Sequence, residues 1–155
     1  MAEPADNIAM ASWYRSLAVA FTHNAKILSH AFEERGEGVV GNRMAAPMYY
    51  LVSHAAELLL KCALFKRGVS PSDLKSVAIR HSLEGLLDEL LRKGVPISEP
   101  CSQLLRKLSH QHERHALRYT VFVDDGEPVF TPQSEELFSM LDELMMAGRI
   151  TTHGV

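Results

Sequence analysis

Apolar residues recur along this 155-residue chain with helical spacing in five segments. The first covers residues 8–34, where Asp6 or Asn7 is the candidate cap of the helix. The second covers residues 46–67 and is apolar on most sides, which is typical of a helix at the centre of a bundle. Between them, residues 35–43 contain three glycines and no periodicity. The pattern therefore predicts two long helices joined by a loop.

Three shorter helices are predicted further along. Leucines form one stripe on a segment that Ser82 caps and Gly94 ends. The next segment has helix-start chemistry at Ser98 and continues to about residue 117. The last opens after a Thr-Pro pair and ends at Gly148.

β-Branched and aromatic residues flank Asp125 and Gly126, a pair typical of a hairpin turn. We therefore expect a short extended or hairpin excursion near residues 120–130. The chain shows no repeat and no alternation of strands and helices. The predicted fold class is all-α, an antiparallel up-and-down bundle of four to five helices in a single domain over residues 1–155.

Charge and composition narrow the functional classes. The net charge of −3 provides no general field that would attract nucleic acid, so any RNA contact has to be local. Cys62 and Cys101 belong to no CxxC spacing, which favours a reducing compartment. The N-terminus is acidic where a signal peptide is basic, and no apolar run is long enough for a membrane span. We expect a cytoplasmic protein with no membrane contact.

Three short motifs occur in a distinctive order: an acidic residue and a lysine one turn apart, a His-x-Leu opening the next helix, and a later Arg-Tyr pair. They are Glu57, Lys61, His81 with Leu83, and Arg118 with Tyr119. In this order they resemble the HEPN family of nucleotide- and RNA-associated helical domains, over about residues 45–145.

The resemblance implies an up-and-down helical bundle that often dimerises, in bacterial toxin–antitoxin or antiviral systems. Implied partners are a second copy of the chain, a nucleotidyltransferase-like protein or antitoxin, and RNA or a nucleotide. Some members are metal-independent ribonucleases, and others are binding or assembly modules. Phosphate-binding glycine loops and the nucleotidyltransferase signature are absent from this chain. We expect no cofactor.

Glu57 and Lys61 are four residues apart and meet on one helix face. Two interpretations stay open. The pair is either part of a solvated face, or part of a semi-buried polar seam in which Glu57 organises a cation such as Arg118, because a buried charge persists only when it is paired.

The ribonuclease members use an arginine followed, after four to six residues, by a histidine. Arg106 and His112 satisfy this count, although an unbroken helix places them about 120° apart. A better-aligned row is formed by His110, Arg114 and Arg118, spaced by four and four. This row could hold a phosphate, or it could be an exposed polar face.

Neither a metal site nor a nucleophilic cysteine is predicted. His112 and His115 are three residues apart, so they do not form the HExxH zinc motif. Cys101 has no general base arranged around it.

Two functional hypotheses follow from these residues. The preferred one is a non-catalytic HEPN-like module that binds a nucleotide, RNA or protein partner as a homodimer. Its polar seam would comprise Glu57, Lys61, His81, Arg118 and Tyr119. The alternative is a HEPN-type endoribonuclease that uses Arg106 with His112, or the row of His110, Arg114 and Arg118. The first is preferred because the arginine–histidine element is poorly formed.

Overall fold

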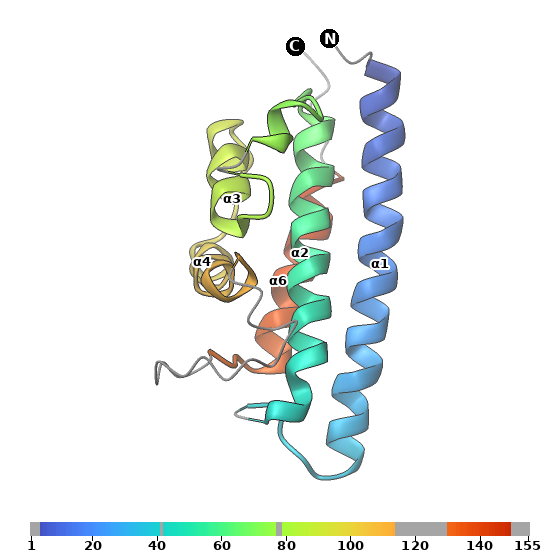
Figure 1. The fold of residues 1–155 in the computed structure, drawn as a ribbon, viewed down its shortest axis with the longest axis vertical. Helices are drawn as coiled ribbons and strands as arrows, with labels where there is room; N and C mark the ends of the chain where they lie inside the picture. Colours follow the sequence, from blue (N-terminus) through green and yellow to red (C-terminus); the bar gives the residue numbers. More distant parts are fainter. Residues whose placement is uncertain (1–3, 41, 77–78, 114–129, 150–155) are drawn as a thin grey trace.

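The computed structural model describes residues 4–40, 42–76, 79–113 and 130–149 (Figure 1). Within these ranges the chain forms five α-helices, two short 3-10 helices and no strand, so the predicted all-α bundle is confirmed. The helices are α1 (Pro4–Glu34), η1 (Arg43–Ala45), α2 (Ala46–Lys66), η2 (Asp73–Lys75), α3 (Leu83–Arg92), α4 (Glu99–Glu113) and α6 (Ser134–Ala147). The excursion expected near residues 120–130 lies outside the described residues, apart from Phe130.

The two longest helices, α1 and α2, form an antiparallel hairpin. The face of α1 that packs on the core has alternating spacings of four and three, the seam spacing of paired helices. It consists of Asn7, Ala11, Tyr14, Ala18, Phe21, Ala25, Leu28 and Phe32. The alanines on this seam are fully buried, which lets the two backbones approach closely.

Helix α1 begins at Pro4, four residues earlier than predicted. Proline suits a first turn because its missing N–H would have no partner there. The expectation that Asp6 or Asn7 caps the helix is therefore wrong. Asp6 lies inside the first turn, and the Asn7 side chain instead donates to the carbonyl oxygen of Val69 at 3.5 Å.

Helix α2 is the central element, with α1 on one side and α3 and α4 on the other (Figure 1). By length and composition it could cross a membrane, with a mean hydropathy of 1.2, but 83% of its apolar window is buried inside the bundle. A core helix of a soluble protein has the same composition. Gly68 follows with φ +78°, a conformation typical of the residue after a helix end.

The predicted ends of α3 are confirmed. The Ser82 hydroxyl accepts from the Gly85 N–H at 3.0 Å, and Gly94 has φ +76°. The Ser98 hydroxyl accepts from the Cys101 N–H at 3.3 Å at the start of α4. Figure 1 shows α4 nearly end-on, so it crosses the long helices rather than running beside them. The predicted continuation of α4 from 114 to 117 lies outside the described residues.

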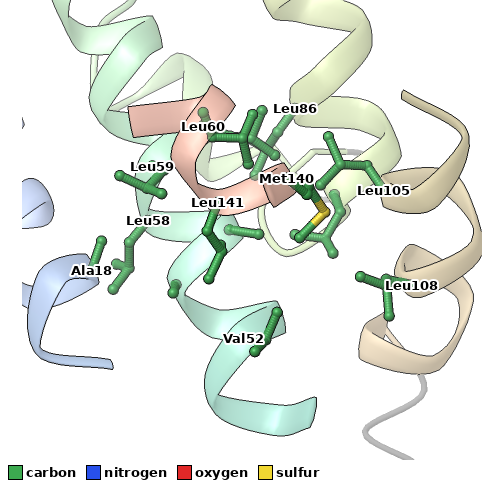
Figure 2. Close-up of a cluster of buried hydrophobic side chains, with 14 of the residues drawn as sticks. Ala18, Val52, Leu58, Leu59, Leu60, Leu86, Leu105, Leu108, Met140 and Leu141 are labelled. Carbon is green, nitrogen blue, oxygen red and sulfur yellow. The ribbon is translucent and has the colours of Figure 1, made fainter. Parts of the chain in front are cut away.

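Helix α6 contributes the last side chains of the hydrophobic core. The Tyr49 hydroxyl, near the start of α2, donates to the Pro132 carbonyl oxygen at 2.9 Å, and Gly148 lies beside Cys62 near the other end of α2. Helix α6 therefore runs in the same direction as α2. Figure 2 shows apolar side chains from α2, α3, α4 and α6 meeting in one cluster, among them Leu60, Leu86, Leu105, Leu108, Met140 and Leu141.

Candidate functional site

A carboxylate is buried in the most apolar helix of the molecule. Glu57 is 3% exposed, although it lies on α2 among leucines and alanines. Burial of an ionised carboxylate without a partner would cost more free energy than the packing of a single helix contributes. Glu57 must therefore have partners that compensate for the lost water.

Three side chains supply that compensation, and we call the four residues together the Glu57 cluster. The Lys61 ammonium donates to Oε1 at 2.5 Å. Nδ1 of His81 lies 3.1 Å from the same oxygen, and Nε2 of His112 lies 2.6 Å from Oε2. Both carboxylate oxygens are thus engaged by described residues.

The cluster keeps Glu57 ionised. Burial by itself would raise the pKa of the carboxyl group, but the hydrogen bonds from His112 and Lys61, together with their charges, outweigh it. The pKa of Glu57 is consequently held well below its usual range. Glu57 is thus an ionised carboxylate surrounded by one lysine and two histidines.

Three elements deliver these groups. Lys61 follows Glu57 by one helical turn, so the pair meets on one face of α2. His81 immediately precedes the cap of α3, and His112 lies in the last described turn of α4.

A buried serine ties α3 and α4 together next to the cluster. The Ser109 hydroxyl accepts from the Glu84 N–H at 3.0 Å and donates to Glu113 at 2.6 Å. This contact anchors the first turn of α3 to α4, and so it helps to hold His81 and His112 on the same carboxylate. Sequence reasoning missed Ser109 because nothing local distinguishes it from an exposed helical serine.

Of the two open interpretations for Glu57 and Lys61, the buried one holds. The side chains of Glu57 and Lys61 are 4% and 10% exposed, which excludes a solvated face. The partners among the described residues differ from the expectation, because two histidines reach Glu57. Arg118, the expected cation, lies outside the described residues, as do Arg114 and Tyr119.

The cluster is open to solvent at one place. The His81 side chain is 54% exposed, whereas His112 is 7% exposed. A histidine that gives Nδ1–H to a carboxylate keeps Nε2 for a second partner. His81 is therefore the group through which the buried charge can act on a ligand.

The two residues of the candidate catalytic pair have different partners. The Arg106 guanidinium donates to Glu84 at 2.5 Å and to Asp88 at 2.6 Å, both on α3. His112 contacts Glu57 instead. The two α3 carboxylates were not singled out from the sequence, although they lie four apart on one face of an amphipathic helix, where a cation from a neighbouring helix would meet both.

Two other histidines lie on the same helices as members of the cluster. His110 is exposed on α4. The His54 ring packs against Phe21 and Tyr50, with centroid distances of 4.6 and 5.9 Å. His54 shares a helix with Glu57 but contributes to packing between α1 and α2.

The described residues do not support a nucleophilic cysteine or a metal site. Burial, with the neighbouring Glu143 charge, raises the pKa of the Cys101 thiol to about 12, which is the opposite of an activated nucleophile. Burial also raises the pKa of Cys62. No group of three or more histidine, cysteine or acidic side chains in those ranges is arranged to hold a metal ion.

Chemically, the Glu57 cluster can present one oriented imidazole to a ligand while its charge stays paired inside the bundle. A separate surface triad, Arg106 with Glu84 and Asp88, joins α3 to α4.

No family model, curated protein or solved structure matches this chain.

Proposed function

We propose that this chain is a non-catalytic HEPN-like helical module that binds a nucleotide, RNA or protein partner as a homodimer. The motif residues support the family assignment through their spatial relation as well as their order. Glu57 and Lys61 lie on the central helix, and His81, with Leu83 two residues later, opens the next α-helix and returns to Glu57.

One observation carries the non-catalytic assignment: Arg106 and His112, the first candidate catalytic pair, have different intrachain partners. Arg106 is held by two carboxylates of α3, and His112 is buried against Glu57. General acid–base catalysis needs both groups at one solvent-filled place within reach of the 2′-hydroxyl and the phosphate. A binding module has no such requirement.

The ligand contact is assigned to His81 because it combines exposure with orientation. Its Nδ1 lies against Glu57, so Nε2 faces away from that carboxylate and can hydrogen-bond to a phosphate or base edge. Arg80 next to it is also exposed and adds a local positive charge, which the overall charge of −3 does not provide.

Fluorescence anisotropy tests this assignment. Labelled single-stranded RNA and a labelled nucleotide are titrated with the wild type and with His81→Ala, under EDTA. We expect binding that weakens at least tenfold in the variant. His30→Ala is the matched control, because His30 is also an exposed histidine beside glutamates and lies on α1, away from the cluster.

Equal binding by His81→Ala and the wild type would contradict the assignment of the ligand contact to His81. Binding that His30→Ala weakens to the same extent would do so as well. If neither probe binds, the partner is a protein, and the same pair of variants is then compared in its capture.

A further inference from the structure

The outer face of α1 is an unusual surface for the edge of a bundle. In Figure 1 this helix forms one side of the molecule, with α2 along its inner face. The described residues include eight large exposed hydrophobic side chains, and four of them, Ile8, Trp13, Val19 and Ile27, lie on α1. Trp13 is 63% exposed.

This face carries no formal charge over most of its length. Between Ile8 and Ile27 the only charged residues of α1 are Arg15 and Lys26. Lys26 turns toward α6, with Nζ 5.5 Å from the centre of the Phe138 ring, and Arg15 is half-buried, where its charge acts on the Cys62 thiol of α2. The solvated face of an edge helix normally carries its charges outward.

A second seam runs along this outer face, on the side opposite the buried one. We call it the outer seam; its members are exposed and are spaced by four, three, four, three and four. They are Ala9, Trp13, Ser16, Ala20, His23 and Ile27. One helix thus has seam spacing on both sides, and the described chain covers only one of them.

Along the outer seam, small and large side chains are ordered so that one copy of the seam fits a second copy that runs in the opposite direction. If two copies pair antiparallel about a point near residue 18, Ala9 shares a layer with Ile27 of the other copy, and Trp13 shares one with His23. The small pair Ser16 and Ala20 falls at the centre, where it allows close approach. Each layer then combines a small side chain with a large one, two aromatic rings, or two small side chains.

We propose that the outer seam of α1 binds the same seam of a second copy of this chain, antiparallel about a two-fold axis near residue 18. In a two-fold interface both copies contribute the same surface, so each contact between two residues occurs twice. A surface without charges therefore avoids repulsion between like charges. The inference takes up the homodimer of the proposed function and rests on it only in that respect.

The size of the contact sets the expected strength. A helix of 31 residues is about 46 Å long, and two such helices in contact over a width of about 10 Å bury roughly 900 Å² in total. This area lies below the roughly 1,200–2,000 Å² of stable interfaces and in the range of weak ones, so we expect a dissociation constant on the order of 10 µM.

Sedimentation of the full chain between about 1 and 100 µM tests the surface, because a dimer of this strength dissociates in that range. We expect the wild type to dimerise and Trp13→Glu to raise the dissociation constant at least 30-fold, since a buried tryptophan is lost and a charge is placed in the seam. Met146→Glu is the matched control: Met146 is 55% exposed on α6, and its replacement should leave the dimer intact. Circular dichroism verifies that both variants fold.

Cysteine cross-linking tests the direction of pairing. Residues 9 and 27 are about 27 Å apart along the helix, far beyond disulfide range. Oxidation of a mixture of Ala9→Cys and Ile27→Cys chains should link one to the other, and neither variant alone should link to itself. The native cysteines are buried and should not interfere.

Self-linking of either single variant, or a dimer that persists in Trp13→Glu, would overturn this interface while leaving the homodimer in place. A wild type that stays monomeric at 100 µM would overturn both the interface and the homodimer. The assay on His81 is independent of either result, so a failure here is distinguishable from a failure of ligand binding.

Discussion

Glu57 carries the strongest electrostatic constraint among the described residues. A carboxylate that is 3% exposed stays ionised because His112 and Lys61 form hydrogen bonds with it and place their charges beside it. Removal of one partner from a buried pair leaves the other charge uncompensated, and this is more costly than the pair is favourable. The stability of the cluster therefore depends on its three buried members, Glu57, Lys61 and His112.

Replacement of Glu57 by glutamine leaves the Lys61 ammonium buried without its counter-charge. We expect the free energy of unfolding to fall by about 3–5 kcal/mol, measured by urea denaturation at pH 7. Glu37→Gln is the control, because Glu37 forms an exposed ion pair with Arg35, and it should change stability by less than about 0.5 kcal/mol. A loss below about 1 kcal/mol for Glu57→Gln would show that the cluster is not a buried ionic network.

The same variant tests how the contribution of Glu57 to the free energy of unfolding depends on pH. Glu57 has a lowered pKa in the folded protein, so its contribution is fully present above the pKa of the unfolded chain, about 4.3. The contribution is lost as the pH falls from there toward the lower pKa of the folded state. The difference in unfolding free energy between wild type and Glu57→Gln should thus shrink as the pH falls from 5 to 3. A difference that stays the same or grows between pH 5 and 3 would contradict the assignment.

Part of the cluster was predictable from the sequence. The spacing of four brings Glu57 and Lys61 together on any helix, and the family pattern points to His81. The contact with His112 was not predictable, because 55 residues separate it from Glu57 and their meeting depends on how α4 crosses α2. Ser109 is hidden for the same reason.

At the scale of elements, the periodicity of apolar residues and the capping residues were sufficient to predict most helix boundaries. Ser82, Gly68 and Gly94 end or begin helices as their residue types require. The start of α1 was misplaced because Asn7 reads locally as a cap, whereas its amide bonds to Val69, a contact that exists only once α1 and α2 pack together.

A matched pair of glycines tests the backbone at the end of α3. An added Cβ would meet nothing within 4 Å at either Gly94 or Gly38, but only Gly94 has a positive φ. Gly94→Ala should destabilise the protein by about 1–2 kcal/mol. Gly38→Ala should be neutral or stabilising by up to about 1 kcal/mol, because it restricts the unfolded chain. Thermal unfolding of both variants measures the contrast, and equal effects would contradict it.

At the scale of the whole molecule, one tyrosine links distant parts of the chain. The Tyr49 hydroxyl donates to the carbonyl oxygen of Pro132 at 2.9 Å and lies 3.3 Å from that of Val39. Burial raises the pKa of Tyr49 to about 12, despite a hydrogen bond from Thr131 that lowers it. This residue joins the loop after α1 to the segment that leads into α6.

Tyr49→Phe should therefore weaken the docking of α6. The carbonyl oxygen of the buried Pro132 would lose this donor, and we expect a loss of about 1–3 kcal/mol in unfolding free energy. Tyr14→Phe is the control, since its ring keeps its edge contact with Phe65 and stability should change by less than about 0.5 kcal/mol. Equal stability of Tyr49→Phe and wild type in chemical denaturation would refute this role.

Incubation of end-labelled RNA with the purified protein in EDTA tests the central claim, that the chain binds without cleaving, most directly. The wild type is compared with Arg106→Ala and with the matched control Arg92→Ala, whose arginine also pairs with an acid of α3. We predict that the RNA stays full-length with all three proteins. Cleavage by the wild type that Arg106→Ala abolishes and Arg92→Ala retains would contradict the account and identify an endoribonuclease.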